Sequence, residues 1–157
     1  GALALSWVCA RFGWLNAGDG ALAAYTLRLA LNKVSMPFEN AFFMGVLCNI
    51  LVTVAVLASL SAKDAAGRIL GAWAPVMFFV VAGFSHSIAD MTYCALALFG
   101  KSAPACAAAA QAAGTDLSAL TWGRYFLGNM LPVTLGNTAG GGLVGLAAWY
   151  CYLRKKG

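Results

Sequence analysis

The sequence alternates long apolar segments with short polar connections, a pattern that predicts membrane-spanning helices. Residues 41–60 contain no charged side chain and, as one helix, are long enough to cross a hydrocarbon core about 30 Å thick. Residues 125–153 are also uncharged. The opening residues resemble the end of a further span, so we expect more chain upstream. With their flanking residues, the expected spans are 1–13 (partial), 38–60, 69–99 and 122–153.

The middle segment, 69–99, is too long for one straight crossing. A single helix over this range would measure ~46 Å, so it either tilts strongly or is interrupted. Its centre reads GFSHSIAD (83–90), with polar residues at 85–87 and at 90. Three consecutive side chains on a helix fan across ~200°, so at least one would face lipid or tight packing. A break near 84–87 removes this conflict, because unwound backbone is tolerated inside a membrane protein.

A second half-helix is predicted to begin at Ser87. The run from Ser87 to Asp90 matches the [ST]-x-x-[DE] capping box. A half-helix that begins within the membrane turns its free N–H groups and positive dipole end inward, which attracts anions. His86, the only histidine, can donate a hydrogen bond or a proton. The alternative is a structural histidine bonded to a backbone carbonyl or to Asp90; the neighbouring serines and the predicted break favour function.

Composition agrees with a membrane protein. Hydrophobic residues make up 62% of the chain and charged residues 10%, against about 25% charged residues in soluble domains. A very apolar soluble protein is the alternative. The five cysteines form no CxxC pair, so neither a metal site nor a disulfide framework is expected. The net charge of +5 comes mostly from scattered residues, which does not indicate nucleic-acid binding. The basic cluster at 154–156 and the basic turn at 61–68 place the carboxyl terminus in the cytoplasm.

The connections and the glycines carry weaker signals. Residues 13–37 are expected to contain a short surface helix that Pro37 separates from the next span, and residues 100–120 a small-residue loop with some helical potential. The last apolar segment has two small-xxx-small patterns, which are typical of close helix packing. They are Gly136/Gly140 and Gly141/Gly145.

Asn49 and Asn137 each place an amide within an apolar segment, where an unpaired polar group costs several kcal/mol. They could hold helices together through hydrogen bonds, or they could face a shared pathway and donate to an anion. From the residues alone, the helix-bonding interpretation is favoured.

Three stretches together resemble the formate/nitrite transporter family: GVLCNILV (45–52), GFSHSIADM (83–91) and LPVTLGNTAGGGLVG (131–145). The resemblance implies an all-α membrane protein with an aquaporin-like helical bundle, a discontinuous helix and two inverted three-helix repeats. It also implies a homopentamer with one pore in each subunit. Residues 1–157 would be part of a single transmembrane transporter domain, namely one repeat plus the end of the preceding span. The other repeat, with its own broken helix and a basic residue that attracts anions, would lie upstream.

The resemblance also implies a substrate pathway. His86 corresponds to the family's central histidine and Phe79 to an apolar constriction. Asn49 and Asn137 correspond to pore asparagines, which replaces the helix-bonding interpretation for both. The remaining expected pathway residues are Val52, Ser85, Ser87, Asp90 and Thr134. The family usually reads G-F-E-H-S-I-A-N, so this chain has Ser in place of Glu and Asp in place of Asn. An ionised Asp90 close to His86 would favour the imidazolium.

The expected function is a channel or proton-coupled transporter for small monovalent weak-acid anions, formate first. His86 would protonate or hydrogen-bond the anion between apolar constrictions. Nitrite, hydrosulfide, acetate or lactate are alternative substrates. The expected partners are the anion, the lipid bilayer and identical subunits, with no nucleic acid and no cofactor. The expected location is a bacterial-type inner or plasma membrane, crossed several times. An intramembrane enzyme is less favoured, since neither a serine nucleophile motif nor HExxH is found, and a structural bundle leaves the polar centre unexplained.

Overall fold

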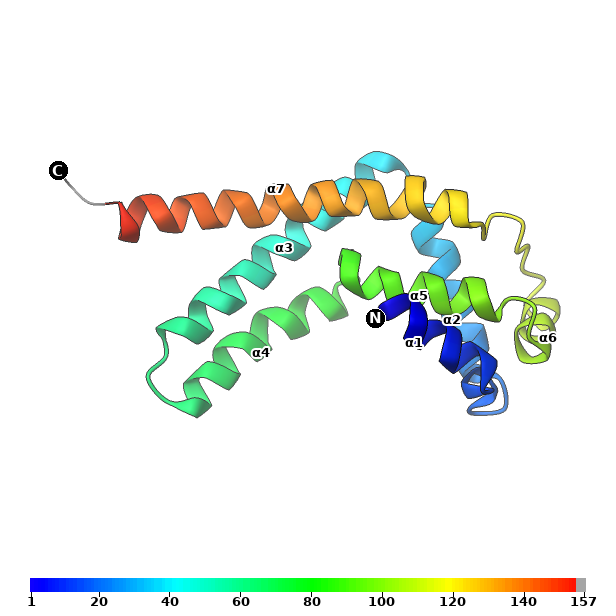
Figure 1. The fold of residues 1–157 in the computed structure, drawn as a ribbon. Coiled ribbons are helices and arrows are strands. Elements are labelled where there is room, and N and C mark those ends of the chain that lie inside the picture. The colour runs from blue at the N-terminus through cyan, green and yellow to red at the C-terminus, as the bar shows by residue number, and fades with distance from the viewer. Residues whose placement is uncertain (155–157) are drawn as a thin grey trace. The chain divides into compact units, whose positions relative to one another are not determined.

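The computed structural model describes residues 1–154, which form helices and connections without a strand (Figure 1). Two compact units divide the chain, and each consists of two separate stretches. The first unit contains Gly1–Phe38 and Ser87–Pro132, and the second contains Glu39–His86 and the described residues from Val133 onward. The all-helical prediction is therefore confirmed over the described residues.

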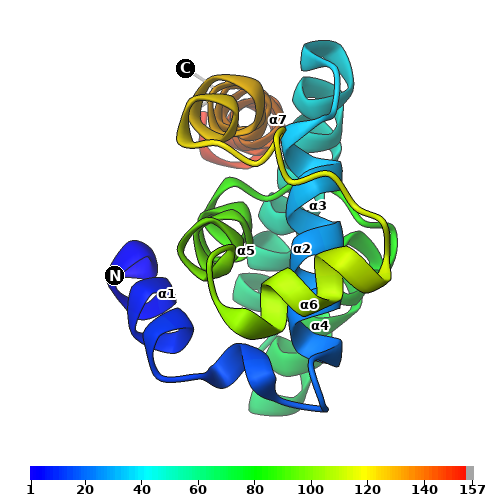
Figure 2. The same cartoon turned by 90° about the vertical axis from the view of Figure 1, so that its right-hand side faces the viewer.

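The first unit is built around α5 (Ser87–Gly100), which packs between α1 and α2 (Figure 2). A run of α5 from Cys94 to Leu98 is buried in the core of this unit. The helix α6 packs against α2. The other elements of the unit are α1 (Ala2–Arg11), η1 (Trp14–Asn16), α2 (Ala21–Val34), α6 (Pro104–Ala112) and the π-helical segment η2 (Arg124–Met130).

The helix α2 lies within 13–37, where the sequence predicts a short surface helix, and it has one exposed and one buried face. Its end at Val34, before Pro37, agrees with the prediction. However, Ala23, Leu27, Ala30 and Lys33 are buried in the first unit. These positions recur every three or four residues and therefore share one face of the helix. The sequence did not identify what covers this face, because α5 is far away in the sequence.

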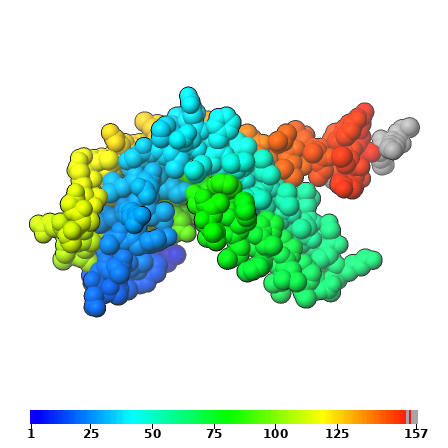
Figure 3. All heavy atoms as spheres, turned by 180° about the vertical axis from the view of Figure 1, so that it is seen from behind, coloured from blue at the N-terminus to red at the C-terminus, as the bar shows by residue number. Residues whose placement is uncertain are grey.

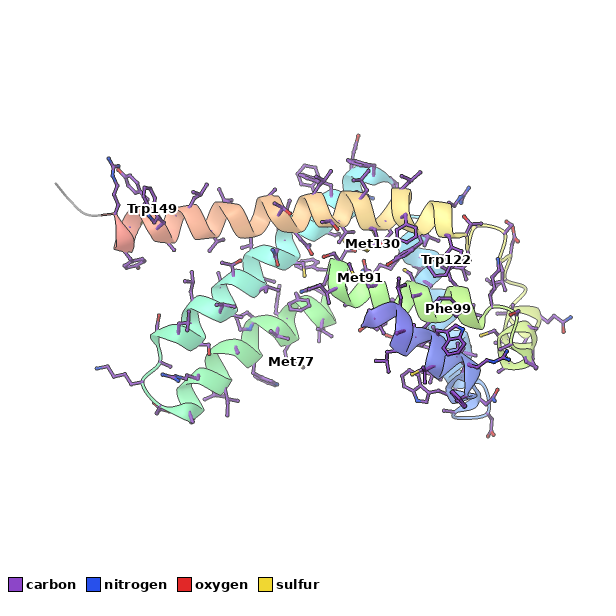
Figure 4. All side chains as sticks on the ribbon, viewed as in Figure 1. Met77, Met91, Phe99, Trp122, Met130 and Trp149 are labelled. Carbon is purple, nitrogen blue, oxygen red and sulfur yellow. The ribbon has the colours of Figure 1, made fainter. Side chains whose placement is uncertain are left out.

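Aromatic rings close one end of the first unit. The rings of Phe99 in α5 and Trp122 lie edge to face, with centroids 5.1 Å apart (Figure 4). Trp122 also contacts Tyr125 and Phe126, with centroids 6.0 Å away in both cases. Edge-to-face pairs contribute about 0.5–1.5 kcal/mol beyond their buried area. This cluster joins the end of α5 to the start of η2.

The second unit contains nearly all of α3 (Phe38–Ser61) and α7 (Leu131–Ala148), whose first residues belong to the first unit, together with α4 (Ala65–Val81) and the π-helical segment η3 (Trp149–Leu153). The helix α4 begins after Asp64, whose Oδ1 accepts a hydrogen bond of 2.8 Å from the backbone N–H of Gly67. It ends at Val81, and the next helix begins only at Ser87. The predicted interruption of residues 69–99 is thus confirmed, and the second half-helix begins at the predicted residue.

The helix α4 lies on the surface in Figure 3 and has no fully buried residue, and most of its side chains are apolar. Trp73, Phe78 and Val81 are 57%, 62% and 78% exposed, respectively. Within the described residues, α3 is long and apolar enough to cross a membrane by itself. The bent pair of α5 and α6, with an angle of 95° between them, meets the same criteria when taken as one span. Lys155 and Lys156, from the basic cluster at 154–156, lie outside the described residues.

Glycines on α7 allow a close approach to the backbone of α3. A Cβ atom on Gly136 would overlap the carbonyl oxygen of Phe42, and one on Gly140 would overlap that of Val46. The pattern Gly136/Gly140 therefore marks close helix packing, as predicted. In the pattern Gly141/Gly145, a Cβ atom on Gly141 would lie 2.7 Å from the Asn49 Nδ2, whereas one on Gly145 would meet no atom within 4 Å among the described residues.

This contact predicts that Gly140→Ala lowers the stability of the protein, whereas Gly145→Ala does not. The added methyl group at position 140 must push α3 and α7 apart, at a cost of about 1–3 kcal/mol. The same methyl group at position 145 enters open space and favours the helix. Thermal unfolding of the detergent-solubilised variants measures the difference. Equal melting temperatures for the two variants would contradict the proposed contact.

Candidate functional site

The connection between α4 and α5, residues 82–86, is the predicted break. It turns at Gly83, whose φ of 71° is readily adopted only by glycine. The N–H groups of Gly83 and Phe84 donate to the carbonyls of Val80 and Phe79, each at 3.1 Å, and so finish the last turn of α4. Ser85 follows and is fully buried. The chain is therefore held in a defined non-helical path just before the histidine.

His86 is the last residue of this connection and is half-buried. Its ring lies 5.9 Å from the ring of Phe79, centroid to centroid, with the two planes tilted by 34°. Phe79 is near the end of α4, so the turn at Gly83 folds the chain back far enough to bring the two rings together. The structure thus places the predicted central histidine next to the predicted apolar constriction residue.

Asn49 and Asn137 connect three segments of the second unit. The Asn137 Nδ2 donates to the carbonyl oxygens of Gly45 at 2.8 Å and Ser85 at 3.2 Å. The Asn49 Nδ2 donates to the carbonyl oxygen of Asn137 at 2.6 Å. These bonds join α3, α7 and the non-helical connection, so both amides hold the unit together. Their further role in a substrate pathway stays a prediction.

Asp90 belongs to a cluster in the first unit. It lies in the first turn of α5, is 1% exposed, and places its Oδ1 3.9 Å from the Lys33 Nζ of α2. Its Oδ2 accepts a hydrogen bond of 3.2 Å from the Asn129 Nδ2 of η2. The carboxylate is thus held by a cation and an amide of its own unit, and an effect of Asp90 on His86 stays a prediction.

The other predicted pathway residues occupy separate places. Val52 lines a groove of about 250 Å³ between α3 and α4, together with Ala72 and Val76. Thr134 is exposed on α7, and its carbonyl oxygen accepts a bond of 2.8 Å from the Thr138 hydroxyl. Ser87 is the half-buried first residue of α5. The structure therefore brings together two groups: Asn49 with Asn137 and Ser85, and His86 with Phe79.

Sequence reasoning missed Lys33 and Asn129. A signal for Lys33 was present, since it continues the buried stripe that runs through Ala23, Leu27 and Ala30. No comparable pattern marks Asn129, because its partners lie 39 and 96 residues away in the sequence. Long-range packing alone reveals its place in the cluster.

Comparison with known proteins identifies the family. The model of the formate/nitrite transporter family matches residues 1–150. The chain belongs to this family. A probable formate transporter of Methanothermobacter thermautotrophicus is 35% identical over 130 residues, which are 81% of this chain and 41% of that protein. The formate channel FocA of Escherichia coli (strain K12) is 33% identical over 174 aligned positions, covering 99% of this chain and 61% of FocA. The chain therefore spans only part of the length of these relatives.

Solved structures of the family have the same fold. A pentameric formate channel with formate bound superposes with a TM-score of 0.85 at 30% identity, over 98% of this chain and 61% of that chain. An FNT family ion channel gives a TM-score of 0.66 at 31% identity. The resemblance found in the sequence and the helical bundle with a discontinuous helix are both confirmed. As a member of this transporter family, the chain belongs to an integral membrane protein.

The bonds of Asn137 predict that Asn137→Leu destabilises the protein. The substitution leaves the carbonyls of Gly45 and Ser85 without this donor, at a cost of about 1–3 kcal/mol. Thr138→Val is the control, since the exposed Thr138 hydroxyl bonds to a carbonyl of its own helix. Thermal unfolding in detergent should give a clearly lower melting temperature for Asn137→Leu than for the control. Equal values would show that the amide does not join these segments.

Proposed function

We propose that the complete protein containing this chain carries small monovalent weak-acid anions across a membrane, with formate as the first substrate. Membership of the formate/nitrite transporter family, with a formate-bound channel at a TM-score of 0.85, is the observation that carries this proposal. The structure adds a broken helix whose connection ends in the only histidine. These features suit a pathway in which an anion must pass an apolar zone.

The first step of the proposed mechanism draws the anion toward the break. The positive end of the α5 dipole, at the start of that helix, attracts negative charge. Further passage brings the anion to the apolar zone at Phe79. The free-energy cost of placing a bare anion in apolar surroundings is far larger than the stabilisation from a single attractive contact. Attraction alone therefore does not explain the transfer.

In the second step, His86 supplies a hydrogen bond or a proton to the anion. Its ring contacts Phe79, so a hydrogen bond or proton from the imidazole reaches the anion at the edge of the apolar zone. Imidazole can give and regain a proton near neutral pH. The anion then crosses as the neutral acid or close to it, and the proton is released on the other side. Ser85, Asn49 and Asn137 hold the connection that carries this histidine. In this scheme Val52, Ser87 and Thr134 line the remainder of the pathway.

This scheme selects substrates by their acidity. Formic, nitrous and hydrosulfuric acids form a neutral species on gaining one proton, and acetic and lactic acids share this property. Chloride does not fit, because hydrogen chloride stays ionised in water. Nitrite and hydrosulfide are therefore the alternative substrates of the same mechanism. No step requires a cofactor or a metal ion.

The proposal includes the assembly and the orientation. The similar formate channel is pentameric, which supports a homopentamer in the lipid bilayer of a bacterial-type inner or plasma membrane. The basic residues of 61–68 and 154–156 support a cytoplasmic carboxyl terminus. Residues 1–157 form part of one transmembrane transporter domain in this account. An enzyme or a structural bundle remains the competing class, and transport assays separate the three.

The mechanism predicts that His86→Phe lowers pH-dependent formate uptake into proteoliposomes by about tenfold or more. The reason is that a general acid–base group contributes this much or more to the rate of a step that needs its proton. Phenylalanine preserves an aromatic contact with Phe79 but carries no proton. His86→Asn retains a hydrogen-bond donor without a titratable proton, so the two variants separate hydrogen bonding from protonation.

Thr138→Val controls for the effect of substitution, since its hydroxyl bonds within α7. Unchanged formate uptake in His86→Phe would rule out the proposed role of the histidine. A wild-type protein that moves no weak-acid anion would rule out the transporter proposal itself.

A further inference from the structure

A buried polar cluster in the first unit joins three elements that are distant in the sequence. It consists of Lys33 from α2, Asp90 from α5 and Asn129 from η2. The Lys33 and Asp90 side chains are 8% and 1% exposed, and Asn129 is fully buried. Asp90 therefore places a buried acidic side chain in the first turn of α5.

The side chains of Lys33 and Asp90 lie close enough for each to stabilise the charge of the other. Removing either side chain would take from the other its oppositely charged partner inside apolar packing, which is costly in any protein core and especially in a membrane protein. At a separation of 3.9 Å they offset one another, and the cluster as a whole is electrically neutral. Removing one member of a buried pair is therefore much more damaging than removing both.

Asn129 orients the pair. Its Nδ2 faces two acceptors, the Asp90 Oδ2 at 3.2 Å and the Lys33 carbonyl oxygen at 3.4 Å. The opposite amide orientation would place an oxygen against two oxygens, so the assignment follows from the contacts. The Asn129 Oδ1 has no hydrogen-bond partner among the described residues. The amide is thus oriented for the carboxylate of Asp90 and the backbone of α2.

The cluster bears on the start of α5, because Asp90 lies in the first turn of that helix and His86 directly precedes it. A carboxylate in this turn opposes the positive end of the helix dipole. The Lys33 ammonium opposes the carboxylate in turn. Whether an anion meets a positive, neutral or negative end of α5 therefore depends on the balance between these two side chains.

We infer that Lys33 and Asp90 act as one charge-compensated pair that positions the first turn of α5 and sets how strongly an anion is attracted to it. Asp90 is thus a positioning residue that also tunes anion affinity, and it does not transfer a proton to the substrate. The transport part of this inference rests on the proposed function; the pairing itself does not. With asparagine at position 90, Lys33 would lose the opposing charge of this carboxylate and the anion would bind more tightly.

The test is a double-mutant cycle in the complete protein with Asp90→Asn, Lys33→Met and the double variant. Both single substitutions keep the approximate size of the side chain and remove its charge. Thermal unfolding should show a lower melting temperature for each single variant and recovery of most of the loss in the double variant.

Formate uptake by the same proteins in proteoliposomes gives the second measurement. The half-saturating formate concentration should fall in Asp90→Asn and rise in Lys33→Met, each by roughly three- to tenfold, because one unit charge acts at short range in a protein interior. In the double variant it should return to within about twofold of the wild type. A purely structural pair would change both single variants in the same direction, so the opposite signs identify the electrostatic role.

Asp116→Asn is the matched control, because Asp116 is exposed and its carboxylate bonds to Ser118. Both measurements should match the wild type in this variant. A double variant no more stable than the weaker single one would overturn the pairing. Single variants that shift the half-saturating concentration equally would overturn the electrostatic role. If the wild type carried no formate, the proposed function and this electrostatic role would both fail, while the unfolding cycle would still decide the pairing.

Discussion

Polar groups within apolar surroundings need partners, and this constraint explains the unusual features of the chain. An unpaired amide or carbonyl in such an environment costs several kcal/mol. Interrupting residues 69–99 leaves backbone groups without helical partners, and the Asn137 amide bonds to one of them at Ser85. The buried carboxylate of Asp90 likewise has partners, because it pairs with Lys33 and accepts a hydrogen bond from Asn129. The break and the buried charges persist because the surrounding helices supply these partners.

The break is predictable from the sequence because its causes are local. The length of 69–99, the three polar residues at 85–87 and the geometry of a helix suffice to place it, and the structure starts α5 at Ser87 as expected. The partners are not local. Asn137 bonds to residues 92 and 52 positions away, and no periodicity within one helix specifies such pairs. The sequence identified the asparagines as amides within apolar segments that could join helices, but their particular partners emerged only from the packing of α3 against α7.

The burial of Lys33 was not predicted from the sequence. A lysine on a short helix between two spans is most often solvated. The apolar stripe of α2 carries Lys33 into the core of the first unit, where Asp90 compensates it. Each of the two residues is unexpected alone, and together they satisfy one constraint.

The central claim is that a weak-acid anion crosses the apolar zone as the neutral acid, with His86 handling the proton. The most direct measurement is the number of protons that enter proteoliposomes with each formate, followed by an internal pH indicator and by formate uptake, with protein-free liposomes as the background. The account predicts about one proton for each formate, consistent with proton transfer by the imidazole. Formate entry that generates a current without internal acidification would contradict it.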